Sequence, residues 1–131
     1  MKFYSFNSQE ERRRIGGSCF IEIQFCKIKA GAKERQIVAI SKINHWQNDS
    51  LYILGDDMDM FYEEYSNIFD CGIYNNLKSG KIDMFGINYY QANSVESIIE
   101  KIQRAQPADY EVLLSWLNKA KEYNGFYILG V

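Results

Sequence analysis

The chain has 131 residues, of which 47% are hydrophobic and 24% are charged, and its formal net charge is −2. This length and composition are typical of one globular domain, so we expect residues 1–131 to fold as a single unit. No apolar run approaches the roughly 20 residues of a membrane span, and we expect neither a membrane anchor nor a secretory signal. The three cysteines lack metal-like spacing, which favours reduced thiols in a cytoplasmic protein.

The charges are distributed unevenly along the chain. Residues 1–42 hold nine basic and four acidic residues, and residues 78–131 hold six of each. Residues 43–77 contain no lysine or arginine, but they carry seven acids: Asp49, Asp56, Asp57, Asp59, Glu63, Glu64 and Asp70. Such a segment repels nucleic acid and attracts basic protein surfaces, so we expect a protein partner and no direct contact with nucleic acid.

Strands dominate the predicted first half of the chain. Runs rich in β-branched and aromatic residues predict strands at 2–6, 18–28, 36–43 and 51–54. In the second run, strict alternation indicates a half-buried strand with Glu22 and Gln24 on its solvent face. Polar stretches connect these strands, at 7–17, 29–33 and 44–50.

A helix is predicted over residues 56–70. At 100° per residue its apolar side chains fall on one side: Phe61, Tyr65, Ile68 and Phe69. Four acids fall within about 60° of each other on the opposite side: Asp56, Asp59, Glu63 and Asp70. Asp57 and Glu64 flank that acidic stripe.

The second half predicts two short strands, two helices and a last strand. The strands are expected at 81–85, 87–90 and 126–129, and the first two could also be one strand bent at Gly86. Asn93 followed by Glu96 predicts a capped helix start, and Pro107 is expected to open the next helix. This order predicts an α+β fold, a mainly antiparallel sheet packed against about three helices on one face.

The sequence contains two candidate chemistries, and neither is well supported. Asp57 and Asp59 follow an apolar strand and could hold Mg²⁺, but acids in a helix's first turn are also stabilised by its dipole. His45 is the one possible base, and no serine or cysteine lies in a nucleophile signature. We therefore expect no enzyme, no metal and no cofactor.

Two further features have alternative interpretations. Trp46 lies in a polar loop and is either a plug over the core or an anchor at an interface. The acidic stripe is either ordinary solvated surface or a binding surface, since a basic partner would relieve the repulsion between its acids.

The chain resembles the bacterial immunity proteins of polymorphic-toxin and contact-dependent growth inhibition systems. The resemblance is carried by a tyrosine-rich composition and by three segments: Phe85-Gly86-Ile87-Asn88-Tyr89-Tyr90, Pro107-Ala108-Asp109-Tyr110 and Asn124-Gly125-Phe126-Tyr127-Ile128-Leu129-Gly130. It implies tight binding of one cognate toxin, often a nuclease, whose basic active site is blocked by an acidic, tyrosine-rich surface. The residues predicted to bind that toxin are Trp46 and six acids: Asp56, Asp57, Asp59, Glu63, Glu64 and Asp70. The four acids of the stripe would substitute for substrate phosphates.

Three other functions remain open on sequence alone. The first is a small cytoplasmic adaptor that binds another basic partner through the same acids. The second is a metal-dependent enzyme that uses Asp57 and Asp59. The third is a nucleic-acid binder that uses the basic residues at 12–14 and 27–35.

Overall fold

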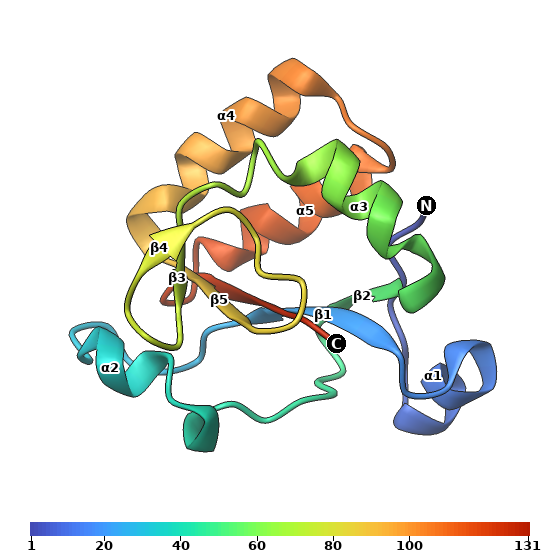
Figure 1. Cartoon of the computed structure of the whole chain (residues 1–131), viewed down its shortest axis with the longest axis horizontal. Coiled ribbons are helices and arrows are strands. Elements are labelled where there is room, and N and C mark those ends of the chain that lie inside the picture. Colours follow the sequence, from blue (N-terminus) through green and yellow to red (C-terminus); the bar gives the residue numbers. More distant parts are fainter.

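Six antiparallel strands form one sheet in the computed structural model, which describes all residues from 1 to 131 (Figure 1). The strands are β1 (Phe20–Phe25), β2 (Leu51–Leu54), β3 (Gly72–Tyr74), β4 (Ser79–Gly80), β5 (Ile87–Tyr90) and β6 (Phe126–Leu129). Their spatial order is β2-β1-β6-β5-β3-β4, so the last strand of the chain lies inside the sheet. The predicted α+β fold with a mainly antiparallel sheet is confirmed.

Helices account for the other regular structure. The α-helices are α1 (Gln9–Gly16), α2 (Glu34–Ile37), α3 (Met58–Tyr65), α4 (Val95–Ala105) and α5 (Tyr110–Ala120). Three 3₁₀ turns accompany them: η1 (Ile40–Lys42), η2 (Gly55–Asp57) and η3 (Ala92–Ser94). None of the helices is both long enough and apolar enough to cross a membrane.

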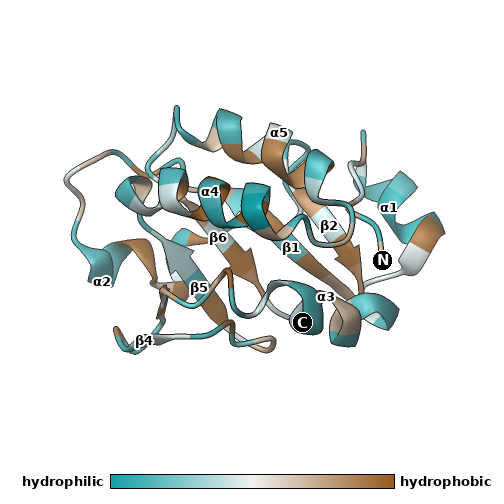
Figure 2. Cartoon of the chain, turned by 90° about the horizontal axis from the view of Figure 1, so that it is seen from above, coloured by the Kyte–Doolittle hydropathy of each residue, from teal (hydrophilic) through white to brown (hydrophobic).

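The main core lies between the sheet and the helices α3, α4 and α5. Figure 2 shows the hydrophobic residues of the strands lying beneath α4 and α5. Ile21 and Ile23 of β1 are fully buried there, and Trp116 of α5 stacks on Phe25 with ring centroids 4.1 Å apart. Each such side chain contributes about 1.5–3 kcal/mol through burial, and this layer fixes α3 against the sheet.

The opposite face of the sheet is also covered, which corrects two predictions. Glu22 and Gln24 were expected in solvent, but their side chains are only 1% and 5% exposed. The predicted return strand over 36–43 is wrong, because β1 already pairs with β2 on one side and β6 on the other. That segment forms α2 and η1 instead and packs Ile37 and Val38 against the sheet.

Several predicted boundaries also differ from the structure near the ends of elements. The strand over 2–6 is reduced to a single bridge between Tyr4 and Tyr52. The strand over 81–85 is absent, whereas the residues just before it form the hairpin of β3 and β4. The helix expected over 56–70 ends at Tyr65, after which the chain turns.

The predicted helix starts at Asn93 and Pro107 are displaced towards the C-terminus. Helix α4 begins at Val95 after the turn η3, and its N-cap residue makes no side-chain capping bond. Helix α5 begins at Tyr110, because Asp109 has φ 56°, a left-handed conformation that interrupts helical geometry.

Candidate functional site

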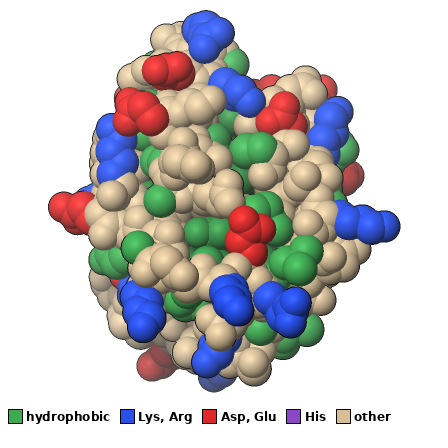
Figure 3. Space-filling model, turned by 90° about the vertical axis from the view of Figure 1, so that its left-hand side faces the viewer, with side chains coloured by type: hydrophobic (Ala, Val, Ile, Leu, Met, Phe, Trp, Pro, Cys, Tyr) green, Lys and Arg blue, Asp and Glu red, His purple; other side chains and the backbone are tan.

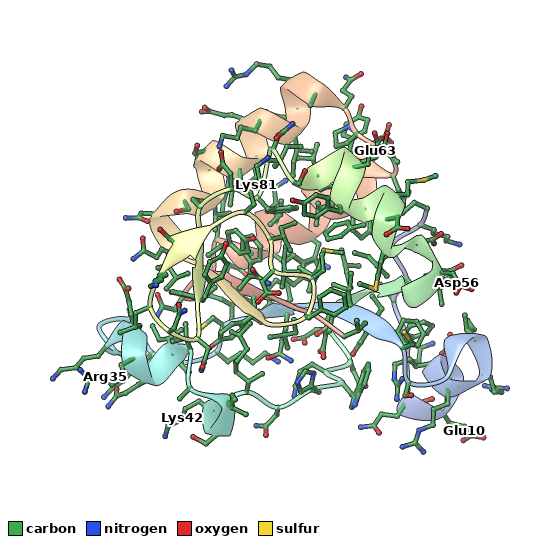
Figure 4. The ribbon with its side chains drawn as sticks, in the orientation of Figure 1. Glu10, Arg35, Lys42, Asp56, Glu63 and Lys81 are labelled. Carbon is green, nitrogen blue, oxygen red and sulfur yellow. The ribbon has the colours of Figure 1, made fainter.

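Four acidic residues of η2 and α3 form an exposed surface, which we call the acidic face: Asp56, Asp57, Asp59 and Glu63. Asp57 is half-buried and the other three are exposed. Figure 4 labels Asp56 and Glu63, and both point away from the body of the molecule. Burial of Phe61 and Tyr65 on the sheet side of α3 holds the acidic face towards solvent, as the predicted periodicity required.

No lysine or arginine of the chain neutralises the acidic face. The ion pairs with lysine elsewhere in the molecule join Lys27 to Asp49, Lys101 to Asp70 and Lys121 to Glu96. None of the four acids of the face takes part in an ion pair or accepts a side-chain hydrogen bond. Because Asp59 and Glu63 are four residues apart, their like charges repel each other on one side of the helix.

The other two predicted acids have partners within the chain. The Glu64 carboxylate accepts a hydrogen bond of 2.9 Å from the Ala108 amide, which ties α3 to the loop before α5. Asp70 lies beyond the end of α3 and pairs with Lys101 of α4 at 3.2 Å. The predicted stripe is therefore shorter than expected, and Asp70 is not part of it.

Two large apolar side chains lie exposed beside the acids. Met60 and Tyr62 of α3 are 48% and 40% exposed. At 100° per residue they lie on either side of Asp59 and Glu63. The surface thus combines negative charge with exposed aromatic and methionine side chains, two residue classes that are enriched at protein interfaces.

Half of the tyrosines are core residues in this protein. Five of the ten are buried: Tyr52, Tyr65, Tyr89, Tyr90 and Tyr127. Burial, and then the nearby Asp109 and Glu64 carboxylates, raise the pKa of Tyr65, whose hydroxyl donates to the Ala108 carbonyl at 2.6 Å. Only Tyr62 is strongly exposed, so the tyrosine content of the acidic face is one residue.

Trp46 covers the opposite face of the sheet and is separated from the acidic face. Its ring stacks on Tyr52 with centroids 6.0 Å apart, and the Arg12 guanidinium lies 3.6 Å from its centroid. Tyr52 points to the other side of β2 from Ile53, which faces α3. Arg12 is 2% exposed, so of the basic residues at 12–14 only Arg13 and Arg14 are exposed.

A buried carboxylate that the sequence placed in solvent organises the Trp46 loop. Glu22 accepts hydrogen bonds from the backbone amides of Trp46 and Gln47, at 2.8 and 3.0 Å, and from the Ser50 hydroxyl at 2.6 Å. The Nδ1 atom of His45 lies 3.7 Å from the same carboxylate. His45 thus lies beside a carboxylate that has a structural role. The buried Cys26 thiol donates a hydrogen bond to the Tyr127 hydroxyl, with 3.6 Å between the two atoms.

Nothing in the sequence indicated an apolar pocket of about 340 Å³, which lies between η1, the start of β5 and the end of β6. Ile40 and Phe85 line it and are 72% and 74% exposed. Phe85 was singled out only within a larger motif, and Ile40 was placed in a strand that does not form.

No group of three or more His, Cys, Asp or Glu side chains is arranged to hold a metal ion. Comparisons with protein-family models, with curated proteins and with solved structures found no match to this chain. The functional argument therefore depends on the surface itself.

Proposed function

We propose that this chain is an immunity protein that acts in the cytoplasm by binding and neutralising one cognate toxin domain. The observation that carries the proposal is the acidic face, four carboxylates without a basic partner beside the exposed Met60 and Tyr62. The toxin is a nuclease, and its basic active site receives these carboxylates in place of substrate phosphates.

The energetics of the acidic face favour a basic partner. Each like-charge pair at this helical spacing costs about 0.2–0.5 kcal/mol in the free protein, and a partner's lysines and arginines remove that cost. Complementary charge also accelerates association, whereas the apolar side chains slow dissociation once water is excluded. Tyr62 is the side chain best suited to anchor the complex, because aromatic residues at the centre of an interface contribute most.

An adaptor that binds another basic protein would use the same surface. The two functions differ in what the partner does when it is free. A toxin arrests growth in the absence of this chain, and the partner of an adaptor does not.

Co-expression tests the proposal. The C-terminal region of the protein encoded next to this chain in the source genome is expressed with and without it, and growth is followed. The double variant Asp59→Lys/Glu63→Lys is compared with Glu111→Lys/Glu100→Lys, which reverses one first-turn acid and one later acid on other helices.

The proposal predicts growth arrest that the wild-type chain and the Glu111/Glu100 variant relieve. The Asp59/Glu63 variant is expected to remain folded and to leave the arrest in place. Arrest that no form of the chain relieves, or relief by the Asp59/Glu63 variant, would contradict the proposal.

A further inference from the structure

A second charged site lies on the covered face of the sheet, where the end of β1 meets residues 42–47. It is a cavity of about 230 Å³. Its polar lining residues are Gln24, Lys27, Lys42, Asn44 and Gln47. Phe25, Ile28 and Tyr127 complete the wall, so no carboxylate lines the cavity.

Of the two lysines that line the cavity, one has an acidic partner and the other has none. Lys42 makes no ion pair in the chain. Lys27 pairs with Asp49 at 2.8 Å, but the two side chains are 48% and 41% exposed. An exposed pair of this kind is stabilised only weakly, so the Lys27 ammonium is free to exchange Asp49 for another anion.

The side-chain amides of Gln24 and Asn44 supply an unused hydrogen-bond acceptor and unused hydrogen-bond donors. Gln24 is 5% exposed, and its Nε2 atom donates to the Glu22 carboxylate at 3.0 Å and to the Asn44 carbonyl at 2.7 Å. These bonds fix the orientation of its amide, while its side-chain oxygen accepts no hydrogen bond within the chain. The side-chain amide of Asn44, an exposed residue of the lining, makes no hydrogen bond within the chain either, so its N–H donors are free.

We propose that this cavity binds a phosphate group. Lysine presents a compact point charge and is a common phosphate-binding residue in proteins. The oxygen of Gln24 then accepts a hydrogen bond from a hydroxyl next to the phosphate or from the protonated phosphate itself. The volume is below the roughly 300 Å³ of pockets that enclose a whole small molecule, so the phosphate and its nearest atoms are the part enclosed.

The surroundings strengthen the attraction of the cavity for anions. Lys29, Lys33 and Arg35 are all exposed on the same covering segment. Figure 3, which views the end of the molecule that carries α2, shows lysine and arginine side chains gathered on the lower part of that surface. In Figure 4 the labelled Arg35 and Lys42 lie across the molecule from Asp56 and Glu63, so the phosphate site and the acidic face do not overlap.

The phosphate can belong to a small phosphomonoester or to a nucleic-acid backbone. Titrations with inorganic phosphate, with adenosine 5′-monophosphate and with a ten-nucleotide RNA distinguish these sources. Binding is followed by the NMR signals of the Gln24, Asn44 and Gln47 side-chain amides in the full chain. The variant Lys27→Met/Lys42→Met is compared with Lys33→Met/Arg35→Met, which removes the same charge outside the cavity.

The expected result is saturable binding of phosphate that shifts these amide signals and that weakens about tenfold or more in the Lys27/Lys42 variant. The Lys33/Arg35 variant keeps the wild-type dissociation constant for the two small probes. Asp49→Asn frees Lys27 and tightens binding, an increase that a folding defect cannot produce.

Tighter binding of the RNA, weakened in both double variants, identifies nucleic acid as the source. Equal binding of the monophosphate and the RNA identifies a small ligand. Absence of saturable shifts, or equal loss of phosphate binding in both variants, would overturn the proposal, because the attraction would then be diffuse or absent.

Discussion

Replacing Glu22 with glutamine tests whether the buried carboxylate holds the Trp46 loop. The substitution keeps the size of the side chain but removes its charge and one acceptor. In the wild type, the Trp46 N–H donates to a Glu22 oxygen at 2.8 Å. In the better of the two orientations of the glutamine, its NH2 group replaces that oxygen, so the Trp46 N–H loses its acceptor. An unsatisfied buried N–H costs about 1–3 kcal/mol.

The remaining bonds to Glu22 also weaken. Those from the Gln47 amide and the Ser50 hydroxyl lose their charge-assisted character, for a further loss of about 1 kcal/mol. The sum is about 3 kcal/mol, a large part of the roughly 5–15 kcal/mol expected for a domain, and it lowers the Tm by roughly 10 °C.

Urea unfolding at 25 °C measures this change, with Glu100→Gln as the control. Glu100 is exposed and is expected to change the free energy of unfolding by less than about 0.5 kcal/mol. A loss below about 1 kcal/mol for Glu22→Gln, at an unchanged dependence on urea, would refute the role assigned to Glu22.

Three further outcomes follow from burial. Stability falls steeply as the pH rises above 10 in urea unfolding, because burial raises the pKa of phenols that titrate near 10 when unfolded. The contribution of these phenols to the free energy of unfolding is complete below pH 10. It is lost as the pH rises further, at about 1.4 kcal/mol per phenol per pH unit. These phenols belong to Tyr52, Tyr65, Tyr89, Tyr90 and Tyr127. An unchanged midpoint at pH 11 would contradict this. Phe85→Ser changes stability by less than about 0.5 kcal/mol because its ring is 74% exposed, whereas Leu117→Ala, at a fully buried position, costs about 2–5 kcal/mol in the same assay. Trp46→Ala lowers stability by about 2 kcal/mol because it uncovers Tyr52 and removes the Arg12 contact; thermal unfolding at wild-type Tm would show that Trp46 is not a plug.

Elements with a strong local pattern were predictable from the sequence. The core of the strand around Ile21, the strand at 126–129 and the buried side of α3 follow from apolar periodicity alone. The same periodicity placed Asp56, Asp59 and Glu63 in solvent, because a helix with one buried side must expose the other.

The remaining features depend on contacts that are distant in sequence. Residues 36–43 have strand-like composition, but β6, which lies about ninety residues further along the chain, occupies the edge of β1 that they would need. Glu22 reads as a solvent-facing residue until the loop at 44–50 folds over it. Asp70 looks like part of the acidic stripe until Lys101 of another helix pairs with it.

The central claim is that the acidic face binds a basic toxin domain. Its most direct test is the association rate constant between the purified toxin domain and this chain, measured by stopped flow from low to high salt. Wild type and the Glu111→Lys/Glu100→Lys variant are predicted to associate rapidly, with rates that fall as salt rises. Asp59→Lys/Glu63→Lys is predicted to associate about tenfold or more slowly at low salt and to lose most of the salt dependence. Equal rates for the two charge-reversed variants would contradict the claim.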